Sequence, residues 1–167
     1  MPARTMPNPP STVTGDLFRH AVTRLPTGVA VLTTTGPDGP VGCTVNAVMS
    51  LSTRPPALLV SLNATSRTLH QILDTGRFAV NVLPWHARHL AGQFATGTPA
   101  QRFAGVDWRP RHGMPVLTGV CLAAVCEVSA STSMLDHTLV AGTVTWLRTG
   151  DHPATVLHAG AQHPLTA

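Results

Sequence analysis

GCTVNAVMSLSTRPPALLVSLNATSRT, residues Gly42 to Thr68, is the stretch of sequence that decides the fold. Its apolar run Ala57–Leu62 is typical of a buried β-strand, and a similar run, Gly28–Thr34, lies shortly before it. The segment between the two runs is rich in hydroxyl groups and ends at two prolines, which interrupt a strand. The stretch therefore predicts neighbouring strands whose ends carry small polar side chains.

These polar side chains form two clusters. The first contains Thr44, Asn46, Ser50, Ser52 and Thr53, and the second, directly after the next strand, contains Asn63, Ser66, Arg67 and Thr68. Hydroxyl groups and free backbone amides at strand ends make a nearly neutral cradle for phosphate and carbonyl oxygens. The pattern predicts a phosphorylated, aromatic cofactor that is held by main chain and hydroxyl groups.

Composition favours one folded domain. The chain has 167 residues, of which 43% are hydrophobic and 11% charged, so it contains enough apolar side chains for a core. The net charge is +4, every basic residue is an arginine, and the arginines form no run. Because only 4% of the residues are aromatic and no basic cluster exists, nucleic-acid binding is disfavoured.

Cysteine usage and hydropathy bear on the compartment. The three cysteines, Cys43, Cys121 and Cys126, form no disulfide framework. Cys121 and Cys126 could form a metal or redox pair, but small buried hydrophobic residues are the better interpretation, and no metal site is expected. The N-terminus has no apolar segment and no apolar run approaches ~20 residues. We expect a cytoplasmic protein with no membrane contact.

Periodicity and turn residues predict mostly strands. The expected elements are a flexible arm at 1–15, a helix Leu17–Arg24 capped by Asp16, strands Val29–Thr34, Val41–Val48 and Ala57–Leu62, a helix from Ser66 to Gly76, a strand Phe78–Leu83, a helix Trp85–Phe94, a loop Thr96–Ala104, a short strand at Val116 and Leu117, and β-rich runs Cys121–Ser129 and His137–Leu147 separated by Ser131–Ser133. No repeated alternation of strand and helix occurs, which excludes a doubly wound parallel sheet. The prediction is a mainly β, antiparallel barrel with helical decorations over residues 16–167.

Several phrases together resemble one family. In chain order they are LPTGVAVLT at 25–33, CTVNA at 43–47, SLS at 50–52, the prolines at 55 and 56, SRT at 66–68, GRFAVNVL at 76–83, RFAGVDW at 102–108 and DHTLV at 136–140. Between Phe18 and Leu147 the chain resembles the flavin reductase family, which has the FMN-binding split-barrel fold. The resemblance implies an antiparallel split β-barrel that binds FMN or FAD, takes hydride from NAD(P)H and forms a homodimer with the flavin near the subunit interface. It also implies a partner, a flavin-dependent monooxygenase that receives the reduced flavin by diffusion.

The resemblance also implies a set of site residues. The flavin-binding positions are Thr27 in the first phrase, then Thr44, Val45, Asn46, Ala47, Ser50 and Ser52, then Ser61, Asn63, Ser66, Arg67 and Thr68, and finally Phe94 and Arg102. His137 corresponds to the residue near the nicotinamide and is the expected catalytic residue. Hydride passes directly from nicotinamide to flavin, so stacking geometry is required more than an acid or base.

Departures from the family pattern leave alternatives open. Ala47 stands where many relatives have serine, Leu135 stands where glycine often precedes the Asp-His pair, and residues 156–163 lack the usual tail aromatics. One alternative is a flavin-retaining biosynthetic enzyme with a substrate other than nicotinamide, and another is a non-catalytic flavin-binding protein. Individually, Ser50 and Ser52 are also compatible with turn hydroxyls, Arg67 with a solvated helix start and His137 with a structural histidine.

Overall fold

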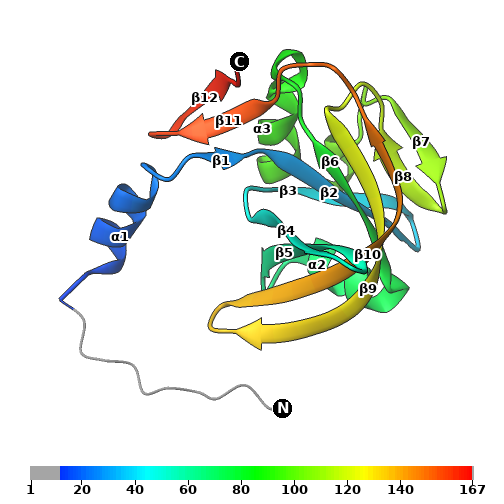
Figure 1. Cartoon of the computed structure of the whole chain (residues 1–167), viewed down its shortest axis with the longest axis horizontal. Helices are drawn as coiled ribbons and strands as arrows, with labels where there is room; N and C mark the ends of the chain where they lie inside the picture. Colours follow the sequence, from blue (N-terminus) through cyan, green and yellow to red (C-terminus); the bar gives the residue numbers. More distant parts are fainter. Residues whose placement is uncertain (1–11, 167) are drawn as a thin grey trace.

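A seven-stranded antiparallel sheet forms the body of the protein, whose computed structural model describes residues 12–166 (Figure 1). Its strand order is β3-β2-β6-β9-β10-β5-β4, and a three-stranded sheet, β1-β11-β12, and a hairpin, β7-β8, complete the strands. The bounds are α1 Gly15–Val22, β1 Thr27–Gly28, β2 Ala30–Gly36, β3 Gly39–Val45, β4 Val48–Thr53, β5 Pro56–Asn63, α2 Arg67–Thr75, β6 Arg77–Val82, a 3-10 turn Trp85–Ala87, α3 His89–Thr96, α4 Pro99–Arg102, β7 Trp108–Arg111, β8 Met114–Leu117, β9 Leu122–Met134, β10 His137–Thr149, β11 Thr155–His158 and β12 Ala161–Pro164. The predicted fold class, mainly β with helical decorations, is confirmed.

Two layers of side chains bury the central strands. On one face Leu32 of β2 and Phe78 of β6 pack with Leu69 and Ile72 of α2. On the other face Val31 packs in a second cluster, which includes Ala91 and Phe94 of α3. Because the central strands are apolar on both faces, they read as continuous hydrophobic runs, which made them recognisable in the sequence.

The helix α2 begins and ends where the sequence predicts. The Ser66 side chain accepts a hydrogen bond from the Leu69 amide at 3.4 Å, as an N-cap does. Gly76 ends the helix with a φ of 67°, a left-handed conformation that glycine adopts at little cost. The helix therefore starts directly after β5, at the edge of the sheet.

The N-terminal prediction needs a correction. The helix cap is Thr14, whose side chain accepts from the Leu17 amide, whereas Asp16 lies inside α1 and pairs with Arg19 at 2.8 Å. The predicted flexible arm thus overlaps the start of α1 at Gly15, and its residues 1–11 lie outside the described residues.

Other boundaries also differ from the expectation. The predicted helix Trp85–Phe94 is divided into a 3-10 turn and α3, and the predicted loop after it contains α4. Residues Ser131–Ser133 lie within β9, so that the β9–β10 hairpin turns at Leu135 and Asp136. The predicted strand Val41–Val48 is divided, since β3 ends at Val45 and β4 begins at Val48. Strands β1, β7, β11 and β12 were not predicted, because they are short or lie near prolines.

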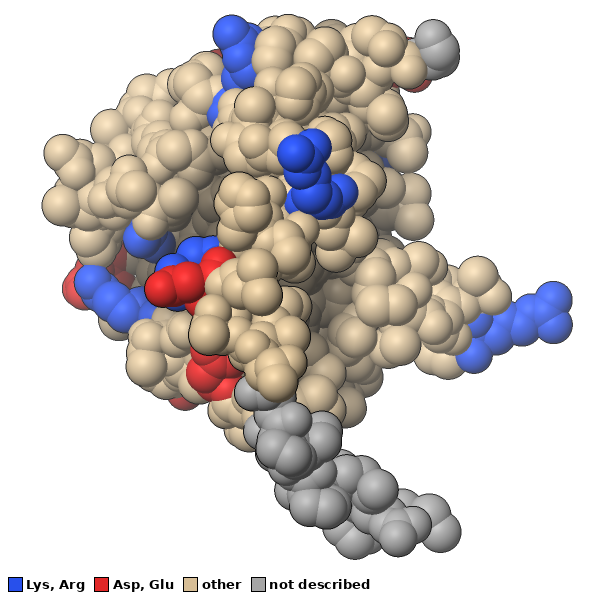
Figure 2. All heavy atoms as spheres, turned by 90° about the vertical axis from the view of Figure 1, so that its left-hand side faces the viewer, with Lys and Arg blue, Asp and Glu red and all other residues tan. Residues whose placement is uncertain are grey.

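Charge and hydropathy of the folded chain agree with the composition. Figure 2 shows basic side chains as separate groups on one face, of which some lie beside acidic side chains and others are surrounded by uncharged residues. Within residues 12–166, no helix combines the length and the apolar character that crossing a membrane requires.

Candidate functional site

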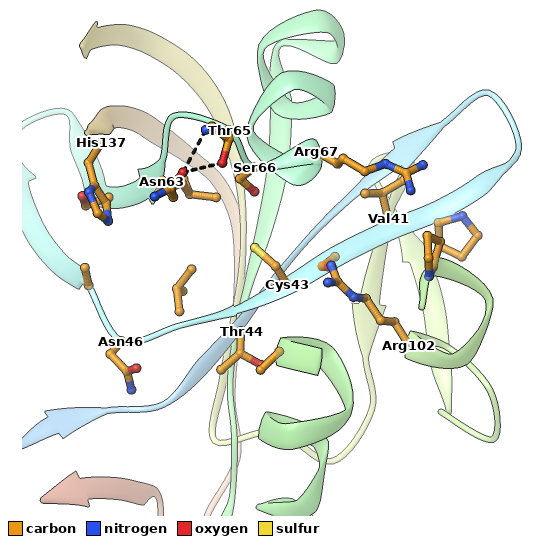
Figure 3. Close-up of a pocket in the computed structure, with 18 residues that line it drawn as sticks. Val41, Cys43, Thr44, Asn46, Asn63, Thr65, Ser66, Arg67, Arg102 and His137 are labelled. Atoms are coloured by element: carbon orange, nitrogen blue, oxygen red, sulfur yellow. Dashed lines mark hydrogen bonds between the residues drawn. The ribbon is translucent and has the colours of Figure 1, made fainter. Parts of the chain in front are cut away.

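A cavity of about 630 Å³ opens between β3, the β5–α2 junction, α4 and the start of β10 (Figure 3). Ten of the predicted site residues line it: Thr44, Val45, Asn46, Ala47, Ser61, Asn63, Ser66, Arg67, Arg102 and His137. They come from four separate parts of the chain, which the antiparallel pairing of β10 with β5 and the packing of α4 against β3 bring together. Part of each polar cluster of the sequence thus faces one space: Thr44 and Asn46 from the first, and Asn63, Ser66 and Arg67 from the second.

The other predicted residues lie outside the lining. Thr27 is in β1 opposite Leu157, Thr68 and Phe94 are buried in the packing of their helices, and Ser50 and Ser52 lie on β4. The Ser52 hydroxyl accepts a hydrogen bond from the Arg54 amide at 3.1 Å, which is a turn contact. Direct contact of these five side chains with a ligand in this cavity is therefore not supported, and their assignment stays a prediction.

Cys43 is a lining residue that the sequence argument did not assign. It lies in the CTVNA phrase, and Figure 3 shows its sulfur directed toward the start of α2. Burial raises the pKa of the Cys43 thiol, so the group is neutral near pH 7. The alternation of side chains along β3 was the signal that could have found it. Three other lining positions were also not predicted, namely Thr65, Pro99 and the backbone of Gly42.

The free edge of β3 forms one wall of the cavity. Among residues 12–166, β3 is an edge strand that pairs with β2 alone, so every second residue turns its amide and carbonyl away from the sheet. The Gly42 carbonyl is such a group, since it accepts from Arg102 Nη1 at 2.7 Å. By the same alternation, the Thr44 amide faces this edge. The Thr44 hydroxyl is already used, because it donates to the Ala91 carbonyl at 2.6 Å.

The start of α2 forms the opposite wall and suits an anion. Asn63 Oδ1 accepts from both the amide and the hydroxyl of Thr65, at 2.9 and 2.7 Å, and so fixes the turn before the helix. The amides of the first helical turn lack intrahelical partners and carry the positive end of the helix dipole. Arg67 adds a full charge, and it has no hydrogen-bond or ion-pair partner among the described residues.

His137 lies at the mouth of the cavity, at the first position of β10. Its Nδ1 and Asp136 Oδ1 are 2.8 Å apart, and the hydrogen bond from His137 lowers the pKa of the Asp136 carboxyl. The Asp136 carbonyl accepts from the Ala64 amide at 2.9 Å, which ties the hairpin to the end of β5. With Nδ1 engaged, Nε2 is the ring nitrogen left for a ligand.

Residues 22–166 match the family model described as the flavin reductase like domain, which covers most of the chain. The chain belongs to the flavin reductase family. It is 44% identical over 139 residues to "Flavin reductase (NADH)" of Kitasatospora aureofaciens, covering 81% of this chain and 72% of that protein. It is 35% identical over 156 residues to "FMN reductase (NADH) RutF 2" of Methylorubrum extorquens, covering 92% and 91%. The family and the enzyme class expected from the sequence, a flavin oxidoreductase, are confirmed.

Solved structures of flavin reductases share the fold. The flavin reductase PheA2 superimposes with a TM-score of 0.86 at 30% identity, over 93% of this chain and 100% of that one. The NADH:FAD oxidoreductase SgcE6 of Streptomyces globisporus gives 0.86 at 25% identity, over 95% and 100%. The split-barrel prediction is confirmed by these neighbours.

Proposed function

We propose that this protein transfers a hydride from NADH to FMN or FAD and supplies the reduced flavin to a separate monooxygenase. The carrying observation is the cavity itself: an uncharged main-chain edge faces a helix start whose free amides and Arg67 suit an anion, across a space of about 630 Å³. The names of relatives agree with the proposal. They include a flavin reductase (NADH) and, at 35% identity over 128 residues, HsaB of Mycobacterium tuberculosis, a reductase subunit of a flavin-dependent monooxygenase.

The residues present fit a flavin phosphate. The amides of Arg67 and Thr68 and the Arg67 guanidinium would hold it, since a helix N-terminus and an unpaired cation both favour an anion. Ser66 serves by capping the helix, because its Oγ accepts from the Leu69 amide. The phosphate end is therefore recognised mainly by backbone and one charge.

The ring system would lie along β3. The edge amide of Thr44 is placed to donate to a carbonyl oxygen, and Cys43, Val45 and Ala47 supply a neutral surface. A bound flavin supplies the hydride-accepting ring that no amino-acid side chain provides. No carboxylate lines this cavity within residues 12–166, so its walls leave the ring environment neutral or positive. Such walls favour a reduced, anionic ring.

His137 would orient the nicotinamide rather than exchange its proton. It lines the cavity, and its hydrogen bond to Asp136 fixes the imidazole with Nε2 as the available nitrogen. Direct hydride transfer needs the two rings stacked, and an oriented donor or acceptor at the mouth provides that geometry. We assign His137 this orienting contact.

No residue of the unusual C-terminal tail lines the cavity of this chain. Residues 155–164 form β11 and β12 in the small sheet with β1, and none of them lines the cavity. The tail difference that motivated a non-nicotinamide substrate thus lies outside the site described above. The hydride-transfer function is preferred for that reason.

A homodimer is part of the proposal. α1 carries apolar side chains with no buried residue, and β4 exposes more than 45% of Met49 and of Leu51 beside the cavity residues Asn46 and Ala47. A second copy would cover such apolar surface. Light scattering at micromolar concentration would report a dimer, and a monomer at every concentration would contradict it.

The catalytic proposal is tested by steady-state oxidation of NADH at 340 nm with added FMN or FAD. We expect NADH oxidation that saturates with flavin and whose rate is proportional to the enzyme concentration. NADPH is assayed in parallel under the same conditions. The control is flavin without protein. A correctly folded protein that gives no oxidation above this control with either nicotinamide would overturn the proposal.

A further inference from the structure

A side chain of α3, that of Gln93, contacts the C-terminal end of α4. Its Nε2 lies 2.9 Å from the Gln101 carbonyl, 3.1 Å from that of Arg102 and 3.0 Å from that of Ala104. An amide nitrogen has two hydrogens, so at least one of them is shared between two carbonyl oxygens. Three carbonyl groups at the end of a four-residue helix are thereby gathered around one half-buried nitrogen.

Arg102 connects this end of α4 to the cavity. Its Nε donates to the Gly97 carbonyl at 2.9 Å, and its Nη1 donates to the Gly42 carbonyl at 2.7 Å. Gly97 is held in turn by Gln93, whose carbonyl accepts the Gly97 amide at 3.0 Å. A Cβ on Gly97 would lie 2.4 Å from that same carbonyl, so only glycine fits there. The main chain of Gln93 thus holds Gly97, one of the two partners of the Arg102 guanidinium, and its side chain holds the backbone carbonyl of Arg102 itself.

The position of Arg102 sets the position of the cavity wall. In the described part of the chain β3 has no neighbouring strand on this edge, and two polar contacts hold it there instead. One is the bond from Arg102 to Gly42, and the other is the bond from Thr44 to Ala91. They lie on either side of Cys43, whose side chain faces the cavity. A shift of Arg102 would therefore move the main chain that we assign to the flavin ring.

We infer that Gln93 is a positioning residue for flavin binding, acting through Arg102 on the edge of β3. Gln93 itself does not line the cavity, so it has no direct contact to offer a ligand there. The inference rests on the proposed function, since it assumes that the flavin ring lies along β3. It implies that flavin affinity depends on the hydrogen bonds that Gln93 donates to three carbonyl groups outside the cavity.

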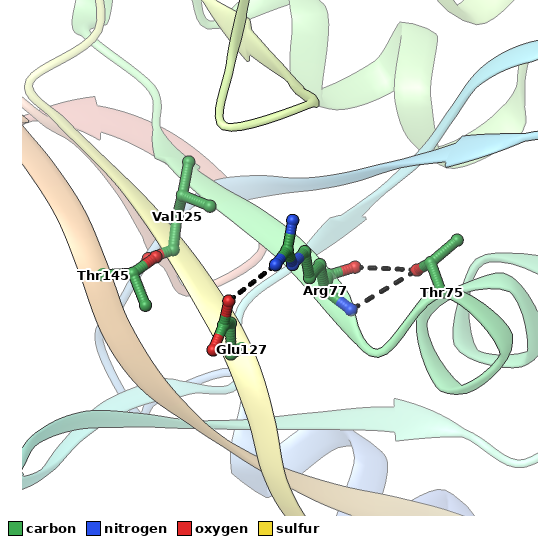
Figure 4. A network of polar contacts seen from close by, with 5 residues as sticks. All are labelled: Thr75, Arg77, Val125, Glu127 and Thr145. Atoms are coloured by element: carbon green, nitrogen blue, oxygen red, sulfur yellow. Dashed lines mark hydrogen bonds and ion pairs between the residues drawn. The ribbon is translucent and has the colours of Figure 1, made fainter.

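The test compares Gln93→Leu with a matched control. Leucine keeps the approximate volume and removes both donor hydrogens. The control is Arg77→Met, which breaks the contact between Arg77 Nη2 and Glu127 Oε1 at 2.9 Å (Figure 4). Arg77 and Glu127 lie on β6 and β9, and neither lines the cavity. The control therefore removes a polar contact of the chain without touching the proposed pathway.

For Gln93→Leu we expect KM for FMN to rise about tenfold with kcat within about twofold of the original, as lost ground-state binding requires. Arg77→Met leaves both constants unchanged. A KM that stays within twofold in a folded Gln93→Leu protein, or a loss confined to kcat, would overturn the inference.

A double variant tests the route through Arg102. Arg102→Met alone raises KM for FMN, and adding Gln93→Leu to it has little further effect if both act on one contact. Independent, multiplying effects would show that Gln93 does not act through Arg102. Should Gln93→Leu not fold by circular dichroism, Gln93→Asn replaces it, because its shorter amide cannot reach all three carbonyls, and about a threefold rise is expected. An Asn variant with unchanged KM would then refute the inference.

The proposed function and the positioning role of Gln93 are contradicted by different results. Absence of NADH oxidation by the unaltered protein counts against the proposed function. Normal activity in the unaltered protein with no effect of the Gln93 variants counts against the positioning role alone.

Discussion

Replacing Arg67 with methionine should weaken the binding of FMN but not that of riboflavin. Arg67 is exposed at the first position of α2 and lines the cavity without a protein partner among residues 12–166. A charge-assisted hydrogen bond contributes about 1.5–3 kcal/mol when shielded, whereas an exposed pair contributes about 0.2–1 kcal/mol. We take about 1 kcal/mol for this half-open site, which is about a fivefold loss of FMN affinity. The helix start remains and retains part of the phosphate preference.

Isothermal titration of both flavins measures this difference directly. Riboflavin lacks the phosphate, so its affinity should be the same for the original protein and for Arg67→Met. The control variant is Arg109→Met, which removes an exposed arginine of β7 that does not line the cavity. An equal loss for FMN and riboflavin, or no loss for FMN, would refute the assignment of the phosphate to the start of α2.

Two further outcomes follow from local packing and charge. Gly142→Ala should destabilise the fold by about 2 kcal/mol and lower Tm by roughly 6 °C, because a Cβ would lie 2.6 Å from Phe78 Cζ inside the core. Gly92→Ala, with open space around its Cβ on α3, should not lower Tm, and equal effects of the two would contradict the packing argument. In a carboxyl NMR titration, Asp136 should show a pKa below its usual 3.8, so that its contact with His137 persists above that pKa and is lost as the pH falls through it. In His137→Gln the Asp136 pKa should return toward 3.8, and an unchanged titration curve would contradict the pairing.

The central strands and α2 could be predicted from the sequence because their signals are local. Apolar runs identified β2, β5 and β6, and Ser66 and Gly76 marked the ends of α2. The edge and tail strands could not be found in this way. β7 contains a proline and β4 ends two residues before Pro55, and within residues 12–166 β11 and β12 pair only with each other and with the two-residue β1, so their apolar pattern is weak.

The cavity was predicted in part, since ten of its lining residues are positions that the resemblance to the family implied. The family phrases could not show which side chains form hydrogen bonds within the protein and are therefore not free for a ligand. The Thr44 hydroxyl binds the Ala91 carbonyl, and Ser52 stabilises its own turn. Nor could they show the contacts of Gln93, which depend on a short helix that the sequence argument assigned to a loop. Such roles depend on contacts between segments distant in the sequence.

A crystal structure of this protein grown with excess FMN would test the central claim most directly. Phosphate density at the amides of Arg67 and Thr68, with the ring along Cys43 to Ala47, is the expected outcome. Well-ordered flavin at another face, with the space between β3 and α2 holding only solvent, would contradict it.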